Sequence, residues 1–191
     1  MIALKEDFPR FTPAEYLAWE ERQEFRHEFV DGEVYAMTGG TINHSKIAVN
    51  LAIMLGTHLR GSGCQVLNGD AKVQTIESNS YCYPDLSVTC DARDRGADQF
   101  ISHPCLIIEV LSPSTEAYDR GDKFRLYRRS IDLQEYVFVS TTAMCLDLYQ
   151  RNERGGWELI SYGSGDVVEL RSINLTFPIE LVYEDIVFTL G

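Results

Sequence analysis

The sequence predicts an α+β fold in which one long helix and one shorter helix pack around a mixed β-sheet. Apolar residues recur at helical spacing across residues 41–60 and predict the long helix. Residues 83–88 and 106–111 are rich in β-branched and aliphatic side chains and are bounded by turn-rich sequence, which predicts two buried strands. The 191 residues contain no internal repeat and no Pro/Gly/Ser-rich linker, so we expect a single domain over residues 1–191.

The first part of the chain predicts a helix followed by a β-hairpin. Residues 12–15 form a capped helix start, with proline at the first helical position and glutamate three residues after the cap, and we expect this helix to end near residue 24. Residues 27–30 and 33–37 then predict two strands joined by Asp31-Gly32, a dipeptide typical of a two-residue hairpin turn.

The rest of the chain predicts short strands, a second helix and a hairpin near the C-terminus. The expected strands are residues 65–67, 71–75, 85–90, 105–111, 135–139, 144–150, 157–162 and 167–170. The second helix is expected over residues 119–129. Residues 175–190 are expected to hold short strands and a helical turn near residues 180–185.

The charge of the chain limits its partners. A formal net charge of −12 argues against passive binding of nucleic acid, because neutralising phosphates requires lysine and arginine. A nuclease is not excluded, since only its cleft has to be electropositive once metal ions are bound. One basic cluster exists, and it is either a solvated helix face or a phosphate-facing surface: Arg120, Lys123, Arg125, Arg128 and Arg129.

Two further sequence features indicate the cellular compartment of the protein and the state of its cysteines. No apolar stretch approaches the roughly 20 residues of a membrane helix, and residues 1–7 lack an apolar leader core, so we expect a cytoplasmic protein without a membrane partner. The five cysteines contain no C-x-x-C pair and lie mostly in apolar segments, which favours buried free thiols over a zinc site or disulfides.

Two acidic residues interrupt the apolar strands. Asp85 opens the segment of residues 83–88, and Glu109 lies late in residues 106–111. A buried carboxylate is costly unless it is paired, protonated or bound to a metal ion. If the two strands pair antiparallel, the start of one lies opposite the end of the other, and both carboxylates reach the same edge of the sheet. This pattern favours a cation site of the kind found in metal-dependent phosphodiesterases.

The spaced motifs together resemble those of a known family. They are Asp31-Gly32-Glu33-Val34-Tyr35-Ala36-Met37-Thr38-Gly39-Gly40-Thr41, Asn43-His44, Tyr83-Pro84-Asp85, and Ile108-Glu109-Val110-Leu111-Ser112-Pro113-Ser114-Thr115 followed by Asp119 and Lys123. This set is similar to the Uma-type restriction endonucleases, a group much expanded in cyanobacteria and placed in the PD-(D/E)XK nuclease superfamily. The resemblance covers nearly the whole chain and implies a restriction-endonuclease-like core with a mixed sheet flanked by helices.

The resemblance also implies a metal site that binds Mg²⁺ or Mn²⁺. The metal-binding aspartate falls on Asp85, the acidic residue of the D/E-x-K element falls on Glu109, and Val110 joins them as a metal ligand. The early acidic residue of the superfamily falls on Glu33. Oxygen ligands of this kind are those that hard divalent cations prefer.

The lysine of the D/E-x-K element is absent, because Leu111 stands two residues after Glu109. Lys123 is the expected substitute, since it shares a helical face with Asp119, and Lys72 is the second candidate. We expect the Lys123 amine within about 6 Å of both carboxylates, a range at which charges still couple.

Two more residues are assigned supporting roles by the pattern. His44 either lies satisfied in the core or orients Glu33 or a phosphate, and Arg120 belongs to the basic cluster beside the site.

These residues together predict a metal-dependent DNA endonuclease that hydrolyses phosphodiester bonds. An alternative is a nuclease-fold protein with weakened catalysis that serves as a nucleic-acid or partner-binding module, which the missing lysine and the acidity favour. An enzyme acting on small phosphorylated molecules is a third possibility, although the chain has no G-x-x-x-x-G-K-[ST] loop. Cleavage of both strands of a duplex commonly uses two sites, so a homodimer is plausible.

Overall fold

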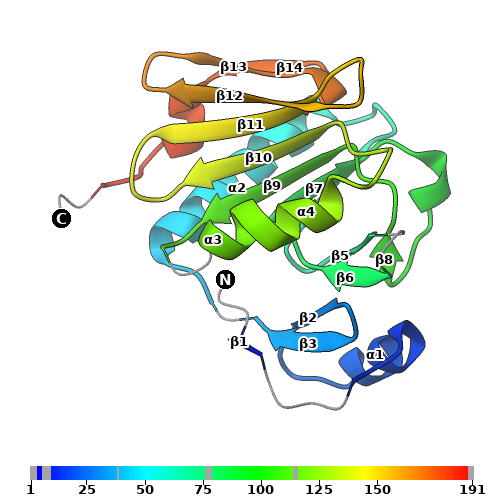
Figure 1. The fold of residues 1–191 in the computed structure, drawn as a ribbon. Coiled ribbons are helices and arrows are strands. Elements are labelled where there is room, and N and C mark those ends of the chain that lie inside the picture. The colour runs from blue at the N-terminus through cyan, green and yellow to red at the C-terminus, as the bar shows by residue number, and fades with distance from the viewer. Residues whose placement is uncertain (1–3, 6–9, 38, 76–78, 114–115, 189–191) are drawn as a thin grey trace.

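The computed structural model describes residues 4–5, 10–37, 39–75, 79–113 and 116–188. Thr38, Ser114 and Thr115 of the family-like motifs, and residues 189–190 of the expected C-terminal segment, lie outside this part of the chain. The described residues form the α+β architecture that the sequence predicts, with mixed sheets and few helices (Figure 1).

The sheet that carries the predicted site has six strands in the order β12-β11-β10-β9-β7-β4. Its strands are β4 (Gln65–Asn68), β7 (Leu86–Thr89), β9 (Leu106–Leu111), β10 (Glu135–Ser140), β11 (Cys145–Arg151) and β12 (Trp157–Gly163). Strands β9 and β10 run parallel, and the other neighbours run antiparallel. The expected antiparallel pairing of β7 and β9 is confirmed, and Leu86 lies opposite Ile108.

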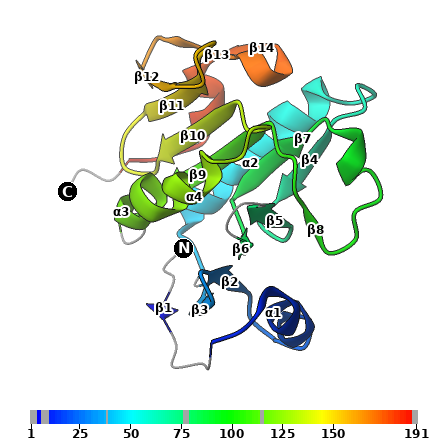
Figure 2. The same ribbon diagram turned by 45° about the vertical axis from the view of Figure 1, so that its right-hand side comes forward.

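Helix α2 (Ile42–His58) covers one face of this sheet (Figure 2). Its first turn is capped by the Thr41 hydroxyl, which accepts a hydrogen bond from the His44 amide at 3.2 Å. Ile47, Leu51 and Leu55 are buried along one stripe of the helix and pack into a core cluster with Ile108 and other residues of the sheet. The helical spacing of these apolar residues is what made the helix predictable.

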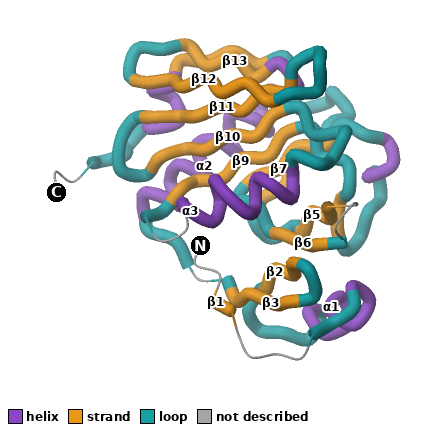
Figure 3. Tube along the Cα trace, in the orientation of Figure 1, coloured by secondary structure: helices purple, strands orange, loops and turns teal. Residues whose placement is uncertain are grey.

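The opposite face of the sheet is covered by a second helical segment, which runs without a loop through α3 (Glu116–Tyr118), the π-helical turn η2 (Asp119–Lys123) and α4 (Phe124–Tyr127) (Figure 3). Phe124 packs against Tyr136 and Phe138 of β10, with ring centroids 5.1 and 6.4 Å away. π-Helical turns are rare and frequently occur at functional sites. The predicted helix over residues 119–129 thus begins three residues earlier and ends two residues sooner.

A second six-stranded sheet has the order β1-β3-β2-β6-β5-β8. Its strands are β1 (Leu4–Lys5), β2 (His27–Val30), β3 (Glu33–Ala36), β5 (Lys72–Thr75), β6 (Ser80–Cys82) and β8 (Phe100–Ile101). Asp31 and Gly32 both have positive φ, 51° and 88°, as a tight hairpin turn between β2 and β3 requires. Strands β1, β6 and β8 were not predicted, because two or three residues carry too little pattern to recognise.

Helix α1 (Pro13–Glu20) packs on the second sheet and starts with the predicted capping box. It ends four residues before the predicted end. Tyr16 stacks on Phe29 at 4.8 Å and donates a hydrogen bond from its hydroxyl to the His27 carbonyl at 2.6 Å. These contacts fix the β2–β3 hairpin, which brings Glu28 toward the main sheet.

The remaining elements are short. They are the 3-10 turns η1 (Ala92–Asp94), η3 (Arg171–Ile173) and η4 (Ile179–Tyr183), and the antiparallel pair β13 (Val167–Leu170) and β14 (Leu175–Pro178). The helical turn expected near residues 180–185 corresponds to η4. In the described part of the chain, no helix has both the length and the apolar character needed to traverse a lipid bilayer.

The cysteine prediction needs a correction, because Cys64 and Cys90 form a disulfide. The antiparallel register of β4 and β7 pairs Gln65 with Thr89, so the two cysteines lie opposite each other just past the strand ends. The spacing of the cysteines could not reveal this pairing, since it depends on the register of two strands. The thiols of Cys82, Cys105 and Cys145 are free, as expected.

Breaking this disulfide is expected to lower the free energy of unfolding. The bond closes a loop with a sequence separation of 26, for which the chain-entropy relation gives about 3 to 4 kcal/mol. Urea unfolding of Cys64→Ser should show this loss, and Cys145→Ser should unfold within about 0.5 kcal/mol of wild type. Equal stability of Cys64→Ser and wild type would show that the cross-link does not constrain the unfolded chain.

Candidate active site

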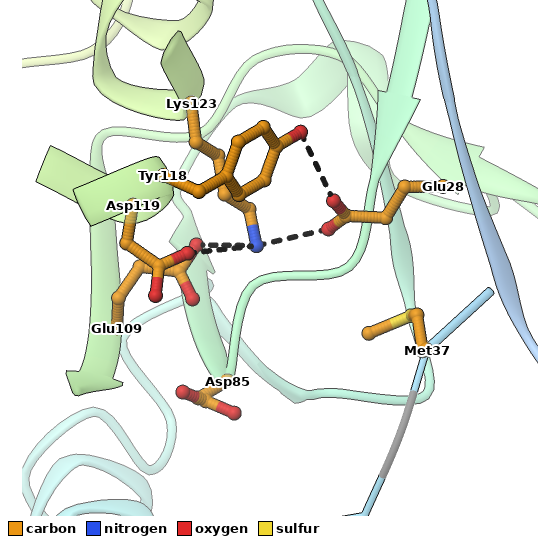
Figure 4. A pocket seen from close by; sticks show the side chains of 7 residues that line it. All are labelled: Glu28, Met37, Asp85, Glu109, Tyr118, Asp119 and Lys123. Atoms are coloured by element: carbon orange, nitrogen blue, oxygen red, sulfur yellow. Dashed lines mark hydrogen bonds and ion pairs between the residues drawn. The ribbon is translucent and has the colours of Figure 1, made fainter. Parts of the chain in front are cut away.

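A small cavity lies where β7 begins and β9 ends, between the main sheet, the π-helical turn and the second sheet (Figure 4). Its lining is rich in ionisable side chains: Glu28, Met37, Asp85, Glu109, Tyr118, Asp119 and Lys123. The free space inside is about 10 Å³, enough for a single water molecule or ion. Four carboxylates and one amine therefore share a volume that holds almost no solvent.

Asp85 reaches this cavity from the residue before β7. Continuing the β7–β9 register by one residue from Leu86 and Ile108 places Asp85 opposite Glu109. Its Oδ2 accepts a hydrogen bond from the Val110 amide at 2.7 Å, and the His44 Nε2 lies 3.2 Å from the same oxygen. Burial alone would raise the pKa of Asp85, but His44, the Val110 amide and Lys123 together hold it below its ordinary value. Asp85 is thus kept ionised although it is 8% exposed.

His44 enters from the first turn of α2 on the other side of Asp85. Its ring packs closely against Gly40, where a Cβ atom would lie 2.9 Å from the ring. A side chain at position 40 would therefore push the imidazole aside. Among the described residues, no hydrogen-bond partner with good geometry reaches the His44 Nε2, so its contact with Asp85 is a charge interaction when the ring is protonated. The structure brings His44 to Asp85, while the sequence pattern had associated it with Glu33 or a phosphate.

Lys123 lies at the centre of the carboxylate cluster. Its Nζ is 2.9 Å from Glu28 Oε1, 2.9 Å from Glu109 Oε1 and 3.9 Å from Asp119 Oδ1. Burial lowers the pKa of a lysine, but here Glu109, Glu28 and Asp119 outweigh it and raise the pKa of Lys123 well above its ordinary value. The expected proximity of Lys123 and Glu109 is confirmed. The amine is protonated and, at 4% exposure, almost fully enclosed.

Glu109 projects from β9 onto the face covered by the π-helical turn. The Tyr136 hydroxyl donates to its Oε1 at 3.4 Å. Burial, reinforced by Asp119, Asp85 and Glu28, raises the pKa of Glu109 well above its ordinary value, although Lys123 opposes this shift. Four carboxyl groups therefore surround one lysine, and a cation bound among them would favour the ionised form of Glu109.

Glu28 is the member of this cluster that the sequence did not reveal. It comes from β2 of the second sheet and ties that sheet to the main one, because its Oε1 accepts from the Tyr83 amide at 3.0 Å and pairs with Lys123. Its Oε2 accepts from the Tyr118 hydroxyl at 3.4 Å. The available signal was its position between His27 and Phe29, inside a strand whose neighbours are apolar or aromatic.

Three of the predicted residues lie outside the cavity lining, and their roles stay predictions. Glu33 is half-buried on β3, where it accepts a hydrogen bond from the Tyr35 hydroxyl at 2.9 Å and lies 3.7 Å from Arg10. Lys72 on β5 places its amine 5.7 Å from the centre of the Tyr83 ring. None of these side chains belongs to the cavity lining.

Arg120 is the third of them. Its guanidinium pairs with Glu116 and Asp147, each at 2.8 Å, and lies over the Phe138 ring. It is therefore neutralised by carboxylates and does not face the cavity. This removes one member of the basic cluster from the candidates for phosphate contact.

Two other predicted residues do reach the site. Asp119 lines the cavity from the π-helical turn and is 5% exposed. The Val110 side chain is buried in the core on the α2 side of the sheet, and its backbone amide holds Asp85. Its part as a metal ligand stays a prediction.

The donor atoms fit a hard divalent cation better than a soft one. Asp85, Glu109 and Asp119 offer only carboxylate oxygens, which suit Mg²⁺ and Mn²⁺. Within the described residues, one set of at least three His, Cys, Asp or Glu side chains has ligand atoms within 4.8 Å of one another, and it lies outside this cavity: Asp91, His103 and Asp132. In that set Arg93 already pairs with both aspartates, at 2.5 and 3.1 Å. Among the described residues of the cavity, no three carboxylates lie as close together as the ligand atoms of that set.

Comparison with known proteins gives one family and several relatives. The sequence model of the Uma2 family, described as "Putative restriction endonuclease", matches residues 13–181. "Uncharacterized protein slr1290" of Synechocystis sp. is 50% identical over 181 residues, 95% of either chain. "Uncharacterized protein sll1609" of the same organism is 31% identical over 150 residues, 78% of this chain and 85% of that one.

A solved structure of similar fold is among the matches. It is described as a putative nuclease belonging to DUF820 from Anabaena variabilis and superposes with a TM-score of 0.75, covering 91% of this chain and 98% of that chain at 15% identity. At this identity the likeness concerns the fold, and it confirms the restriction-endonuclease-like architecture that the sequence motifs predicted.

Proposed function

Because the chain belongs to the Uma2 family, we propose that it is a divalent-metal-dependent endonuclease that hydrolyses phosphodiester bonds in DNA. The observation that carries this proposal is the buried cluster in which Asp85 lies opposite Glu109 in the strand register and Lys123 pairs with Glu109 and Glu28. Carboxylate oxygens gathered in an enclosed cavity are the ligand type that Mg²⁺ and Mn²⁺ prefer.

Asp85 and Glu109 would hold the cation, with Val110 and Asp119 beside them. A divalent cation bound there supplies positive charge to the attacked phosphate and makes water more acidic. The chain's own residues prepare this site. His44 and the Val110 amide keep Asp85 ionised and oriented, and Glu28 fixes the position of the Lys123 amine.

Lys123 takes the place of the missing lysine of the D/E-x-K element. Its raised pKa means that it carries a proton at neutral pH, so it acts as a hydrogen-bond donor and a positive charge and does not serve as a general base. It can orient an attacking water or offset charge on a phosphate oxygen. The lysine comes from the π-helical turn, which is why the pattern along β9 ends in Leu111.

Cleavage of supercoiled plasmid DNA tests the proposal. We expect nicked and linear products with Mg²⁺ or Mn²⁺, and none when a chelator is added. The alternative function, a binding module with the nuclease fold, is favoured by the net charge of −12 and by the apolar residue at position 111. It predicts DNA retention without cleavage in either metal, a result that would exclude the endonuclease.

We also propose that residues 1–191 fold as one domain and that the active form is a homodimer. Glu28 links the two sheets through the cavity, which supports a single cooperative unit. Two sites in a dimer would let the enzyme cut both strands of a duplex. Coincident unfolding transitions measured by two probes would support a single domain. Light scattering at the concentration of the cleavage assay tests whether the protein is a dimer.

Gly40 provides a test of the role of His44. A methyl group at position 40 would lie 2.9 Å from the His44 ring, so Gly40→Ala should displace the imidazole from Asp85. We expect DNA cleavage to fall by about tenfold, since shifts of about 1 Å in a positioning group cost up to about a hundredfold. Initial rates at saturating Mg²⁺ measure the effect.

The neighbouring Gly39 gives a matched control. No atom of the described residues lies within 4 Å of a Cβ placed at position 39, so Gly39→Ala should cleave DNA at the wild-type rate. Equal loss of activity in Gly40→Ala and Gly39→Ala would show that cleavage depends on the loop backbone and not on the position of His44.

A further inference from the structure

A second hollow opens directly beside the cavity, on the side of α2. It is a cleft of about 530 Å³, and Asp85 and His44 belong to its lining. Asp85 thus lines both the enclosed cavity and the open cleft. A substrate that reaches the carboxylate cluster from solvent can approach through this cleft.

One wall of the cleft is apolar. Ala48, Val49 and Ala52 of α2 line it, and Val49 is 51% exposed although it is a large aliphatic side chain. Near the start of the helix, Thr41 and Ser45 add hydroxyl groups to the rim. Sugar and base surfaces pack on apolar walls of this kind, while hydroxyl groups can donate to phosphate oxygens.

The described residues that line the cleft include two carboxylates, Asp70 and Asp85, and one lysine or arginine, Arg26. Its guanidinium is 2.6 Å from Asp70 Oδ1, and it also donates to the Gly69 carbonyl. The side chain is 48% exposed, so its outer donors face solvent at the mouth of the cleft. An arginine held in this way is positioned for a phosphate that passes Asp85.

The basic cluster of the helical segment is a weaker candidate for phosphate contact. Arg120 is paired with Glu116 and Asp147, and Lys123 is buried in the cavity. Arg125 is 3.1 Å from Asp122. None of these residues lines the α2 cleft, and the helical segment covers the opposite face of the main sheet (Figure 3), so it does not supply positive charge to a strand bound in this cleft.

We infer that the α2 cleft binds a single polynucleotide strand, with Arg26 contacting a phosphate next to the one at Asp85. This inference rests on the proposed nuclease function and specifies that the substrate is single-stranded. Duplex binding depends on many lysine and arginine contacts with phosphates, which a chain of net charge −12 with one cation at the cleft does not supply. Binding of a single strand depends less steeply on phosphate neutralisation than binding of a duplex does, and its unpaired bases are free to contact the apolar wall.

Fluorescence anisotropy with a labelled oligothymidylate, alone and annealed to its complement, tests the inference. Ca²⁺ replaces Mg²⁺ so that binding can be measured apart from cleavage. We expect tighter binding of the single strand than of the duplex. Arg26→Gln should weaken single-strand binding by about tenfold, as for loss of one charge-assisted hydrogen bond, and should reduce the salt slope by about 0.7.

Two further variants distinguish a local effect on binding from a loss of the fold. Asp70→Asn removes a negative charge from the cleft lining but keeps a hydrogen-bond acceptor beside Arg26, so it should tighten binding, which a disrupted fold cannot do. Arg129→Gln, an exposed member of the basic cluster, should bind as wild type does. Circular dichroism and thermal melting confirm that each variant is folded.

The outcomes separate this inference from the proposed function. Unchanged binding by Arg26→Gln, preferential binding of the duplex, or no binding of either probe would overturn the cleft assignment, even if plasmid cleavage is observed. Arg26-dependent binding of the single strand without metal-dependent cleavage would leave the cleft assignment intact and refute the endonuclease.

Discussion

Asp85→Asn is expected to lower metal-dependent DNA cleavage by about a thousandfold, equivalent to about 4 kcal/mol of transition-state stabilisation. The substitution keeps an oxygen that can accept from the Val110 amide but removes the charge that the lowered pKa of Asp85 preserves. A neutral amide binds a divalent cation poorly, so the loss should appear in kcat at every Mg²⁺ concentration. Single-turnover cleavage of a labelled oligonucleotide measures it.

Asp98→Asn is the matched control, because Asp98 is an exposed aspartate outside the cavity lining. It should cleave at the wild-type rate. A loss of less than about tenfold in Asp85→Asn, or an equal loss in both variants, would mean that Asp85 does not hold the catalytic cation.

Lys123→Met is expected to reduce the free energy of unfolding by about 3 to 5 kcal/mol in metal-free buffer and to abolish cleavage. Its amine lies 2.9 Å from both Glu28 and Glu109, and its removal leaves two buried carboxylates without a counter-charge. Urea unfolding at neutral pH with a chelator measures the loss. Saturating Mn²⁺ should restore part of it, since the ion replaces the missing positive charge.

Lys72→Met distinguishes the two lysines that the sequence offered. Lys72 is half-buried and contacts the Tyr83 ring, a contact worth about 0.5 to 1 kcal/mol. This variant should cleave DNA and unfold close to wild type. Loss of activity in Lys72→Met with retention in Lys123→Met would reverse the assignment of the displaced lysine.

The strand pairing at the centre of the site could be predicted from sequence. The apolar segments around Asp85 and Glu109 are short and continuous, with a turn-rich stretch between them, and such segments pair as neighbours. The resemblance to the nuclease family implied a displaced lysine, because Leu111 stands at the position that normally holds it on β9, and Lys123 and Lys72 were the two candidates. The motifs thus named Asp85, Glu109 and Lys123, and all three line one cavity. Their catalytic roles stay predictions.

Which glutamate of the β2–β3 hairpin lines the cavity, Glu28 or Glu33, could not be predicted from sequence. Both lie in the β2–β3 hairpin, and the hairpin turn is equally compatible with either carboxylate facing the main sheet. The decision comes from how the second sheet docks on the first, through the Tyr83 amide and the Lys123 amine. Such docking depends on the whole tertiary structure, which a strand pattern does not contain.

The disulfide and the partners of Arg120 could not be predicted either, because these contacts also depend on the tertiary structure. Cys64 and Cys90 meet through the register of β4 and β7, and Arg120 meets Asp147 of β11 through the packing of the helical segment on the sheet. Local sequence gives the residue types but not their neighbours. Charge patterns along a helix are therefore weak guides to ligand-binding surfaces.

Calorimetric titration of Mn²⁺ into the wild-type protein and into Asp85→Ala and Glu109→Ala tests the central statement most directly, because it needs no substrate. We predict one Mn²⁺ per chain for wild type and binding weakened by at least about tenfold in each variant. Equal Mn²⁺ affinity in all three proteins would contradict the claim that these two carboxylates form the metal site.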